Sequence, residues 1–178
     1  MRGRVSARFR AALAGAALAL PLAAPALEPR FDHRDQFGLL LSGGYGWSQQ
    51  TVQGGQSRSA FQWNLQLAFS FDVWDGNELV FGATWIPRSD SMPEGTQAAL
   101  NARYRGYFGS EEFKTYFEVG LWSGVYPRFG IGPMAAIGAQ YDFDETWGLF
   151  ATLSFATAFG QFRGVGAGLG AGVQARWP

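Results

Sequence analysis

The 178-residue sequence contains no cysteine, one lysine (Lys114) and one histidine (His33). Without cysteine there can be neither a disulfide nor a thiolate metal site, and one histidine supplies too few ligands for zinc. We therefore expect no metal and no other cofactor. The scarcity of lysine is also informative, because soluble domains commonly cover their surfaces with lysine and glutamate.

The charge is balanced at 14 basic and 14 acidic residues, and four of the arginines lie within the first ten positions. No basic patch with interleaved aromatic residues is present, which argues against nucleic acid as a partner. Glycine and aromatic residues are abundant instead, at 25 glycines and 16% aromatics. Such a combination is unusual for a soluble domain, so the order of these residues along the chain needs an explanation.

Residues 1–26 have the layout of a cleavable secretory signal peptide. Four arginines lie within the first ten positions, an apolar run follows over Ala11–Leu20, and the small-x-small sequence of a cleavage site lies at Ala24–Ala26. The apolar run is shorter than the ~20 residues of a membrane-spanning helix. We expect export, a short periplasmic leader over 27–36 and a single domain over 37–178.

The mature chain alternates between apolar and polar residues, most clearly from Ala60 to Val73. A helix would scatter both kinds of residue around its circumference, so period-two alternation indicates a strand. One face of this strand holds Phe61, Trp63, Leu65, Leu67, Phe69, Phe71 and Val73.

The same alternation recurs to give eight strands, an even number at the lower end of the range for bacterial barrels. The other seven begin near Phe37, Leu79, Ala98, Phe113, Phe129, Trp147 and Val165. The sequence therefore predicts an all-β fold, an eight-stranded antiparallel transmembrane β-barrel with up-and-down meander topology.

The connections between these strands are expected to alternate in length. Short turns are predicted at Asp75–Asn77, Gly109–Ser110 and Asp142–Thr146, and longer loops at Gln49–Arg58 and Pro87–Gly95. Membrane barrels have short periplasmic turns and longer extracellular loops, so both chain ends are expected on the periplasmic side.

A soluble barrel that carries an apolar ligand would also alternate, with its apolar face inward. Two features favour lipid outside instead: the last strand has glycine at every second position from 164 to 172, and aromatic residues gather near strand ends. The predicted aromatic girdle comprises Tyr45, Trp47, Trp63, Phe71, Trp85, Phe108, Tyr141, Trp147, Phe159 and Trp177.

Glycine-rich alternating strands, aromatic-flanked turns such as AQYDFDETWGLFA, and a final strand that ends in an aromatic residue resemble the small outer-membrane β-barrels of Gram-negative bacteria, of the OmpX, OmpW and OmpA transmembrane-domain type. The resemblance covers the whole mature chain and implies location in the outer membrane. It also implies the β-barrel assembly machinery as a partner, although Pro178 follows the aromatic Trp177.

If the polar face points inward, charged side chains must pair inside a medium of low dielectric constant. A two-residue turn at Gly109–Ser110 would place Arg103 opposite Tyr116 and diagonal to Glu118. The predicted charge network of the lumen comprises Arg103, Arg105, Glu112, Lys114, Glu118, Arg128 and Arg176, and Asp72 and Glu78 are candidates to join it from other strands.

These features favour a non-enzymatic barrel with a structural or interaction role. Its lumen would be plugged, and its loops would contact lipopolysaccharide or an envelope protein through Arg58 or Arg88. A narrow porin-like pore or small-molecule transporter is the main alternative. A lipid A-modifying hydrolase is a weaker alternative, because His33 precedes the first strand and no serine or acid is held near it. A soluble periplasmic carrier is the remaining one.

Overall fold

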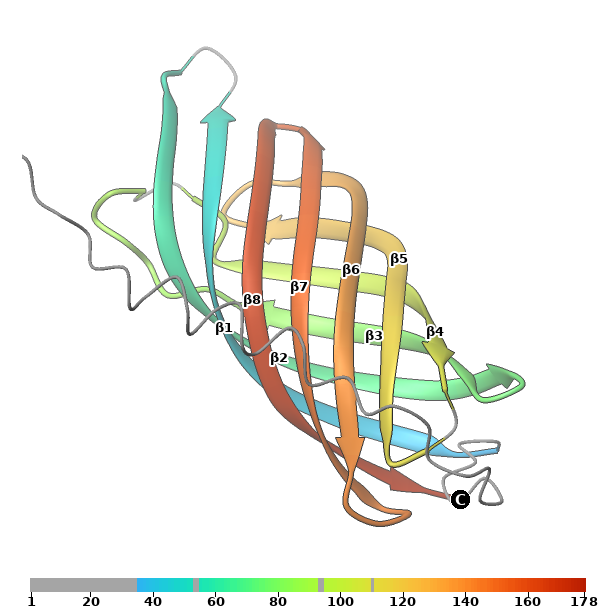
Figure 1. The fold of residues 1–178 in the computed structure, drawn as a ribbon. Helices are drawn as coiled ribbons and strands as arrows, with labels where there is room; N and C mark the ends of the chain where they lie inside the picture. Colours follow the sequence, from blue (N-terminus) through green and yellow to red (C-terminus); the bar gives the residue numbers. More distant parts are fainter. Residues whose placement is uncertain (1–34, 53–54, 93–94, 110) are drawn as a thin grey trace, which may run out of the picture.

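The computed structural model describes residues 35–52, 55–92, 95–109 and 111–178, and these form a closed barrel of eight antiparallel strands (Figure 1). Each strand pairs with the next in sequence, and the last returns to pair with the first. The strands are β1 (Phe37–Val52), β2 (Ser57–Trp74), β3 (Asn77–Trp85), β4 (Ala98–Phe108), β5 (Phe113–Tyr126), β6 (Gly130–Asp142), β7 (Trp147–Gly160) and β8 (Phe162–Trp177). The predicted eight-stranded meander is confirmed.

None of the described residues belongs to a helix long and apolar enough to cross a membrane.

The pairing register sets the tilt of the strands. Paired residues followed strand by strand from Gly38 lead back to β1 at Ser48, ten residues farther along. A circuit of eight strands that climbs this far requires a strong tilt against the barrel axis. A barrel of this size has an interior just wide enough to be filled by side chains.

The period-two pattern sorts the side chains onto two faces as the sequence predicts. On β2, the outward side chains of Trp63 and Leu67 are 67% and 46% exposed. The inward side chain of Ala68, the next residue after Leu67, is 0% exposed. The outer surface is apolar on every strand and far exceeds the patches that soluble monomers expose. Lipid is the solvent that suits such a surface.

Aromatic side chains lie near both ends of this apolar surface. Phe37 pairs with both Phe71 and Trp177 at the turn end, and Tyr45 pairs with Trp63 towards the other end. Eight residues separate Phe37 from Tyr45, about 26 Å along a strand before tilt is considered, which is comparable with the ~25 Å apolar band of membrane barrels. The residues predicted for the girdle lie near these two levels: Phe71, Phe108, Tyr141, Trp147 and Trp177 at the turn end, and Tyr45, Trp47, Trp63, Trp85 and Phe159 at the loop end.

The first predicted loop, Gln49–Arg58, is wrong in its bounds. Strand pairing continues through Gln50 with Arg58 and Thr51 with Ser57, so the β1–β2 hairpin extends well beyond its neighbours (Figure 1). Beyond the apolar band both faces of these strands are polar, so the sequence no longer alternates between apolar and polar residues, although the backbones still pair. The long connection at this end is the one between β3 and β4, over 86–97.

The predicted two-residue turn between β4 and β5 is also wrong. The strands end at Phe108 and resume at Phe113, so Arg103 faces Gly120 rather than Tyr116. The slip is by an even number of residues, and for that reason every side chain within β4 and β5 keeps its predicted face.

A charge on the outer face at mid-height should destabilise the barrel strongly. For Leu67→Arg we expect a loss of about 2–4 kcal/mol in the free energy of unfolding, because the arginine would face the middle of the apolar band. Urea titration of the protein in lipid vesicles measures this. Ser59→Arg is the matched control, on the same strand and face but above the aromatic level, and should cost at most about 1 kcal/mol. Equal losses for both variants would contradict the assignment of the membrane level.

Candidate functional site

The half of the lumen nearest the turn end holds seven buried charged side chains. We call them the charge network: Glu78, Arg103, Arg105, Lys114, Glu118, Asp142 and Arg176. They come from β3, β4, β5, β6 and β8, so only the closed barrel brings them together. Each is at most 6% exposed.

Positive and negative groups alternate along the network without a break. Its ion pairs run in order from Arg103 to Lys114: Arg103–Glu118 at 3.1 Å, Glu118–Arg105 at 2.7 Å, Arg105–Glu78 at 3.5 Å, Glu78–Arg176 at 3.1 Å, Arg176–Asp142 at 3.2 Å and Asp142–Lys114 at 2.8 Å. Each carboxylate therefore lies between two cations. Such mutual pairing compensates the cost of removing these charges from water.

Neutral side chains complete the network. The Tyr107 hydroxyl donates to Glu78 (3.0 Å) and accepts from Arg176 (2.9 Å). The Gln174 amide donates to Glu78 (3.2 Å) and accepts from Arg105 (3.3 Å). The Arg105 guanidinium also lies 4.4 Å from the centre of the Tyr116 ring, a cation–π distance.

The structure brings together five of the side chains that were predicted for the lumen and excludes two. Arg103, Arg105, Lys114, Glu118 and Arg176 belong to the charge network. Glu112 is exposed in the β4–β5 turn, because that turn is longer than predicted and β5 begins only at Phe113. Arg128 lies in the β5–β6 connection at the loop end, far from the network in strand register.

Of the two other carboxylates of the network, Glu78 was predicted from the sequence as a candidate to join it, and Asp142 was not predicted. Both lie at a strand end beside a turn, where an acidic residue is equally well explained by turn chemistry. Their positions in the alternating pattern indicate that both side chains point into the lumen, because Glu78 precedes the outward Leu79 and Asp142 follows the outward Tyr141.

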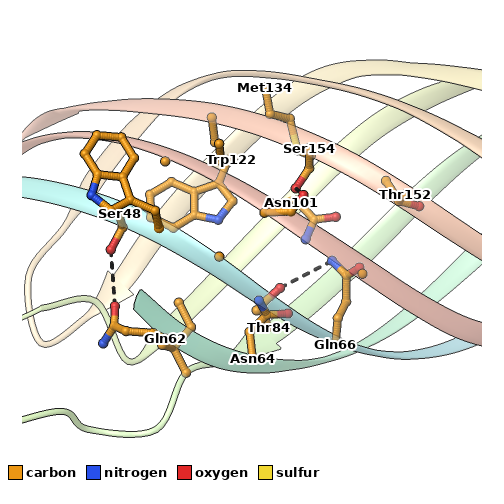
Figure 2. A pocket seen from close by; sticks show the side chains of 18 of the residues that line it. Ser48, Gln62, Asn64, Gln66, Thr84, Asn101, Trp122, Met134, Thr152 and Ser154 are labelled. Atoms are coloured by element: carbon orange, nitrogen blue, oxygen red, sulfur yellow. Dashed lines mark hydrogen bonds between the residues drawn. The ribbon is translucent and has the colours of Figure 1, made fainter. Parts of the chain in front are cut away.

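The half of the lumen nearest the loop end contains a chamber of about 200 Å³. Figure 2 shows amide side chains of β2, Gln62, Asn64 and Gln66, on one side, with Met134 and Ser154 across from them. Four glycines of β8, at positions 164, 166, 168 and 170, also line it. At the loop end the buried Thr96 donates its backbone N–H to Gln50.

Arg103 connects the charge network to the chamber. Its guanidinium is held by Glu118 and donates to Asn101 (3.0 Å) and Gln66 (3.2 Å). Gln66 in turn donates to the Thr84 hydroxyl at 3.3 Å (Figure 2). The amides at the floor of the chamber are thus oriented by a charged group that lies below them.

The two loop arginines singled out from the sequence, Arg58 and Arg88, are both exposed at the loop end. Arg58 lies on the extended part of β2 and Arg88 in the β3–β4 connection. Arg163, at the start of β8, is exposed at the same end and was missed, because no pattern marked it as a loop residue.

His33, the signal peptide and most of the predicted leader lie outside the described residues. Among the residues that are described, no group of three or more His, Cys, Asp or Glu side chains could hold a metal ion.

Removing one carboxylate from the centre of the charge network should be costly. We expect Glu78→Gln to lower the free energy of unfolding by about 3–5 kcal/mol, because two buried arginines lose a shared counter-charge. The shift in the urea midpoint measures the effect. Glu112→Gln removes the same charge from the exposed turn and should change stability by less than about 0.5 kcal/mol. A small effect at Glu78 would mean that the network contributes little to stability.

Comparisons with known proteins agree with this architecture. No protein-family model matches the chain, and no curated protein matches its sequence. The crystal structure of Neisserial surface protein A matches with a TM-score of 0.60 and 14% identity, over 78% of this chain and 96% of that one. A de novo designed transmembrane β-barrel matches at 0.52 and 12%, over 81% and 97%.

The attachment invasion locus protein Ail of Yersinia pestis matches at a TM-score of 0.49 and 14% identity, over 81% of this chain and 99% of that one. At such identities the likeness concerns fold and leaves function open. The resemblance predicted from the sequence is confirmed at that level: the chain has the closed, eight-stranded fold of the small outer-membrane β-barrels.

Proposed function

We propose that this chain is an integral barrel of the bacterial outer membrane with a structural and interaction role rather than an enzymatic one. The observation that carries the proposal is the opposite charge of the two ends of an apolar-faced barrel. The fold, the outward apolar surface and the predicted signal peptide support the location, with the turns in the periplasm and the loops outside.

The loop end is basic and the turn end acidic. Among the described residues, the exposed basic side chains are Arg58, Arg88 and Arg163, and all lie at the loop end with one exposed acid, Asp90. At the turn end, the exposed charged side chains of the part of the chain that the structure describes are all acidic: Asp35, Asp75, Glu111, Glu112, Asp144 and Glu145. A basic outer rim suits the phosphate groups of lipopolysaccharide, since arginine binds phosphate through paired N–H donors.

Arg163 has the best position for such a contact. It lies on the outer face of β8, two residues from the outward-facing Val165 towards the loop end, and pairs with Thr51 of β1. A long side chain here can rest its methylenes on the apolar surface and extend its guanidinium to the headgroup level. Arg58 and Arg88 would contact the same phosphates, or an envelope protein, from the loops.

A plugged lumen is part of the same proposal. Two observations support this role for the charge network: its side chains are buried, and each of its carboxylates lies between two cations. Carboxylates held in this way are not available to relay protons or to bind a substrate. For folding into the membrane, the exposed Trp177 at the end of β8 is the residue that the assembly machinery would recognise.

A plugged barrel should not conduct. We expect planar bilayers that contain the folded protein to show no single-channel steps, because the charge network fills the half of the lumen nearest the turn end. The heat-dependent shift in gel mobility provides the check that the inserted protein is folded. Discrete, reproducible channel steps from folded protein would favour the porin-like alternative.

The loss of the rim arginines should weaken binding to lipopolysaccharide. For the triple variant Arg58→Gln, Arg88→Gln and Arg163→Gln we expect a loss of about 1 kcal/mol per arginine, as for basic residues at other anionic membrane surfaces. Stabilisation of the folded protein by added lipopolysaccharide, compared with phosphatidylcholine, measures it.

The matched control removes three charges from the other end, through Glu111→Gln, Glu112→Gln and Glu145→Gln, and should leave this stabilisation unchanged. Dephosphorylated lipopolysaccharide should stabilise the wild type no more than it does the arginine variant. Undiminished binding by the arginine variant would refute the proposed contact.

A further inference from the structure

Two glycines of β8 lie where nothing in the backbone requires glycine. Gly168 and Gly170 lack the positive φ that favours glycine at Gly76 and Gly109. A Cβ at Gly168 would come no closer than 3.4 Å to another atom, and one at Gly170 no closer than 3.6 Å. Glycine destabilises a strand relative to residues with a side chain. What these two positions provide is the free space of the chamber.

Other lumen glycines differ in this respect. A Cβ at Gly172 would collide with the backbone carbonyl of Leu41, and one at Gly46 would lie 2.6 Å from that of Ala167. Close packing between strands therefore explains those glycines. It does not explain Gly168 and Gly170, both of which line the chamber.

Across the chamber, a buried amide presents unused hydrogen-bond donors. Asn101 is 6% exposed, and its side-chain oxygen accepts from Arg103. A guanidinium can only donate, so the oxygen must face Arg103 and the orientation of the amide is fixed. The Asn101 amide nitrogen then has no hydrogen-bond partner among the described residues, and Asn101 lines the chamber. A donor in this position needs a ligand or water as its partner.

Two further amides of β2 have free capacity on the same side (Figure 2). Asn64 forms no side-chain hydrogen bond with any described residue, although it lines the chamber. Gln62 accepts from Ser48 at 3.2 Å, which leaves its amide nitrogen available. Carboxamides with free donors and acceptors match hydroxyl groups, which also donate and accept.

The charge and size of the chamber limit what it can hold. The two charged residues of its lining, Arg103 and Glu118, are paired with each other at 3.1 Å. A charged ligand would lose its hydration without gaining a counter-ion, so the ligand must be neutral. The volume of about 200 Å³ is below that of drug-sized sites, at ~300–1,000 Å³, and suits a single six-membered ring.

We propose that the chamber binds a small, uncharged, hydroxyl-rich molecule of monosaccharide size. Its hydroxyls meet the amides of Gln62, Asn64 and Asn101. Its C–H face lies on the bare backbone at Gly168 and Gly170 and against Trp122. This site is independent of the rim arginines, so the failure of one proposal leaves the other standing.

Saturation-transfer NMR on the full-length mature protein tests the proposal. The probes are glucose, N-acetylglucosamine and inositol, with glucuronate and glucosamine as charged analogues of the same size. The protein is held in phosphatidylcholine nanodiscs, because sugar-headed detergents would compete for the site. We expect transfer to at least one neutral probe and at least tenfold weaker binding of its charged analogues.

Three variants locate the binding. Gly168→Leu fills the chamber and should abolish the signal, whereas Ala167→Leu places the same side chain on the outer face of β8 and should not. Asn64→Leu removes an amide that has no partner among the described residues and keeps the number of side-chain heavy atoms constant. It should retain the fold and weaken binding about tenfold, the value of roughly one hydrogen bond.

The heat-dependent gel shift establishes that each variant is folded before it is scored. Loss of the signal in Gly168→Leu and Asn64→Leu, with retention in Ala167→Leu, supports the proposal. It is overturned if folded wild type gives no signal with any neutral probe, because the chamber then holds water alone. It is equally overturned if the signal survives in Gly168→Leu, or if the charged analogues bind as well as the neutral probes.

Discussion

The structure depends first on the need of every backbone N–H and C=O group to find a partner where there is no water. A sheet edge exposed to lipid would leave a row of unpaired groups, each of them costly. The pairing of β8 with β1, from Phe37–Trp177 to Val52–Phe162, removes both edges. Closure with eight strands then sets the tilt and the narrow lumen, so the interior must be occupied largely by side chains.

Within that lumen, buried charges are acceptable only when they are paired, and the barrel meets this condition by alternating them. Seven charged side chains from five strands form one continuous series, with Tyr107 and Gln174 among their neutral partners. Arg103 ends this series and orients the amides above it. The charged half and the amide-lined half of the lumen are therefore one hydrogen-bonded system with two different surfaces.

Glycine has two separate roles in this system. At Gly120 and Gly172 the neighbouring backbone comes too close for any side chain, so glycine permits tight strand contact. At Gly168 and Gly170 there is room for a Cβ, and glycine instead keeps the chamber open. Composition alone cannot distinguish these roles, because both appear in the sequence as the same regular glycine pattern of β8.

The sequence by itself determined the features that depend on local alternation: the number of strands, their meander order, the apolar outer face and the inward position of Arg103, Arg105, Lys114, Glu118 and Arg176. Period two is a property of the extended backbone, so it can be read from neighbouring residues alone. Register cannot: β4 ends at Phe108 and β5 begins only at Phe113, a turn longer than the local sequence pattern predicts. Only closure brought Glu78 of β3 to Arg176 of β8, and only the packing of side chains across the barrel decided that one half of the lumen is filled and the other left hollow.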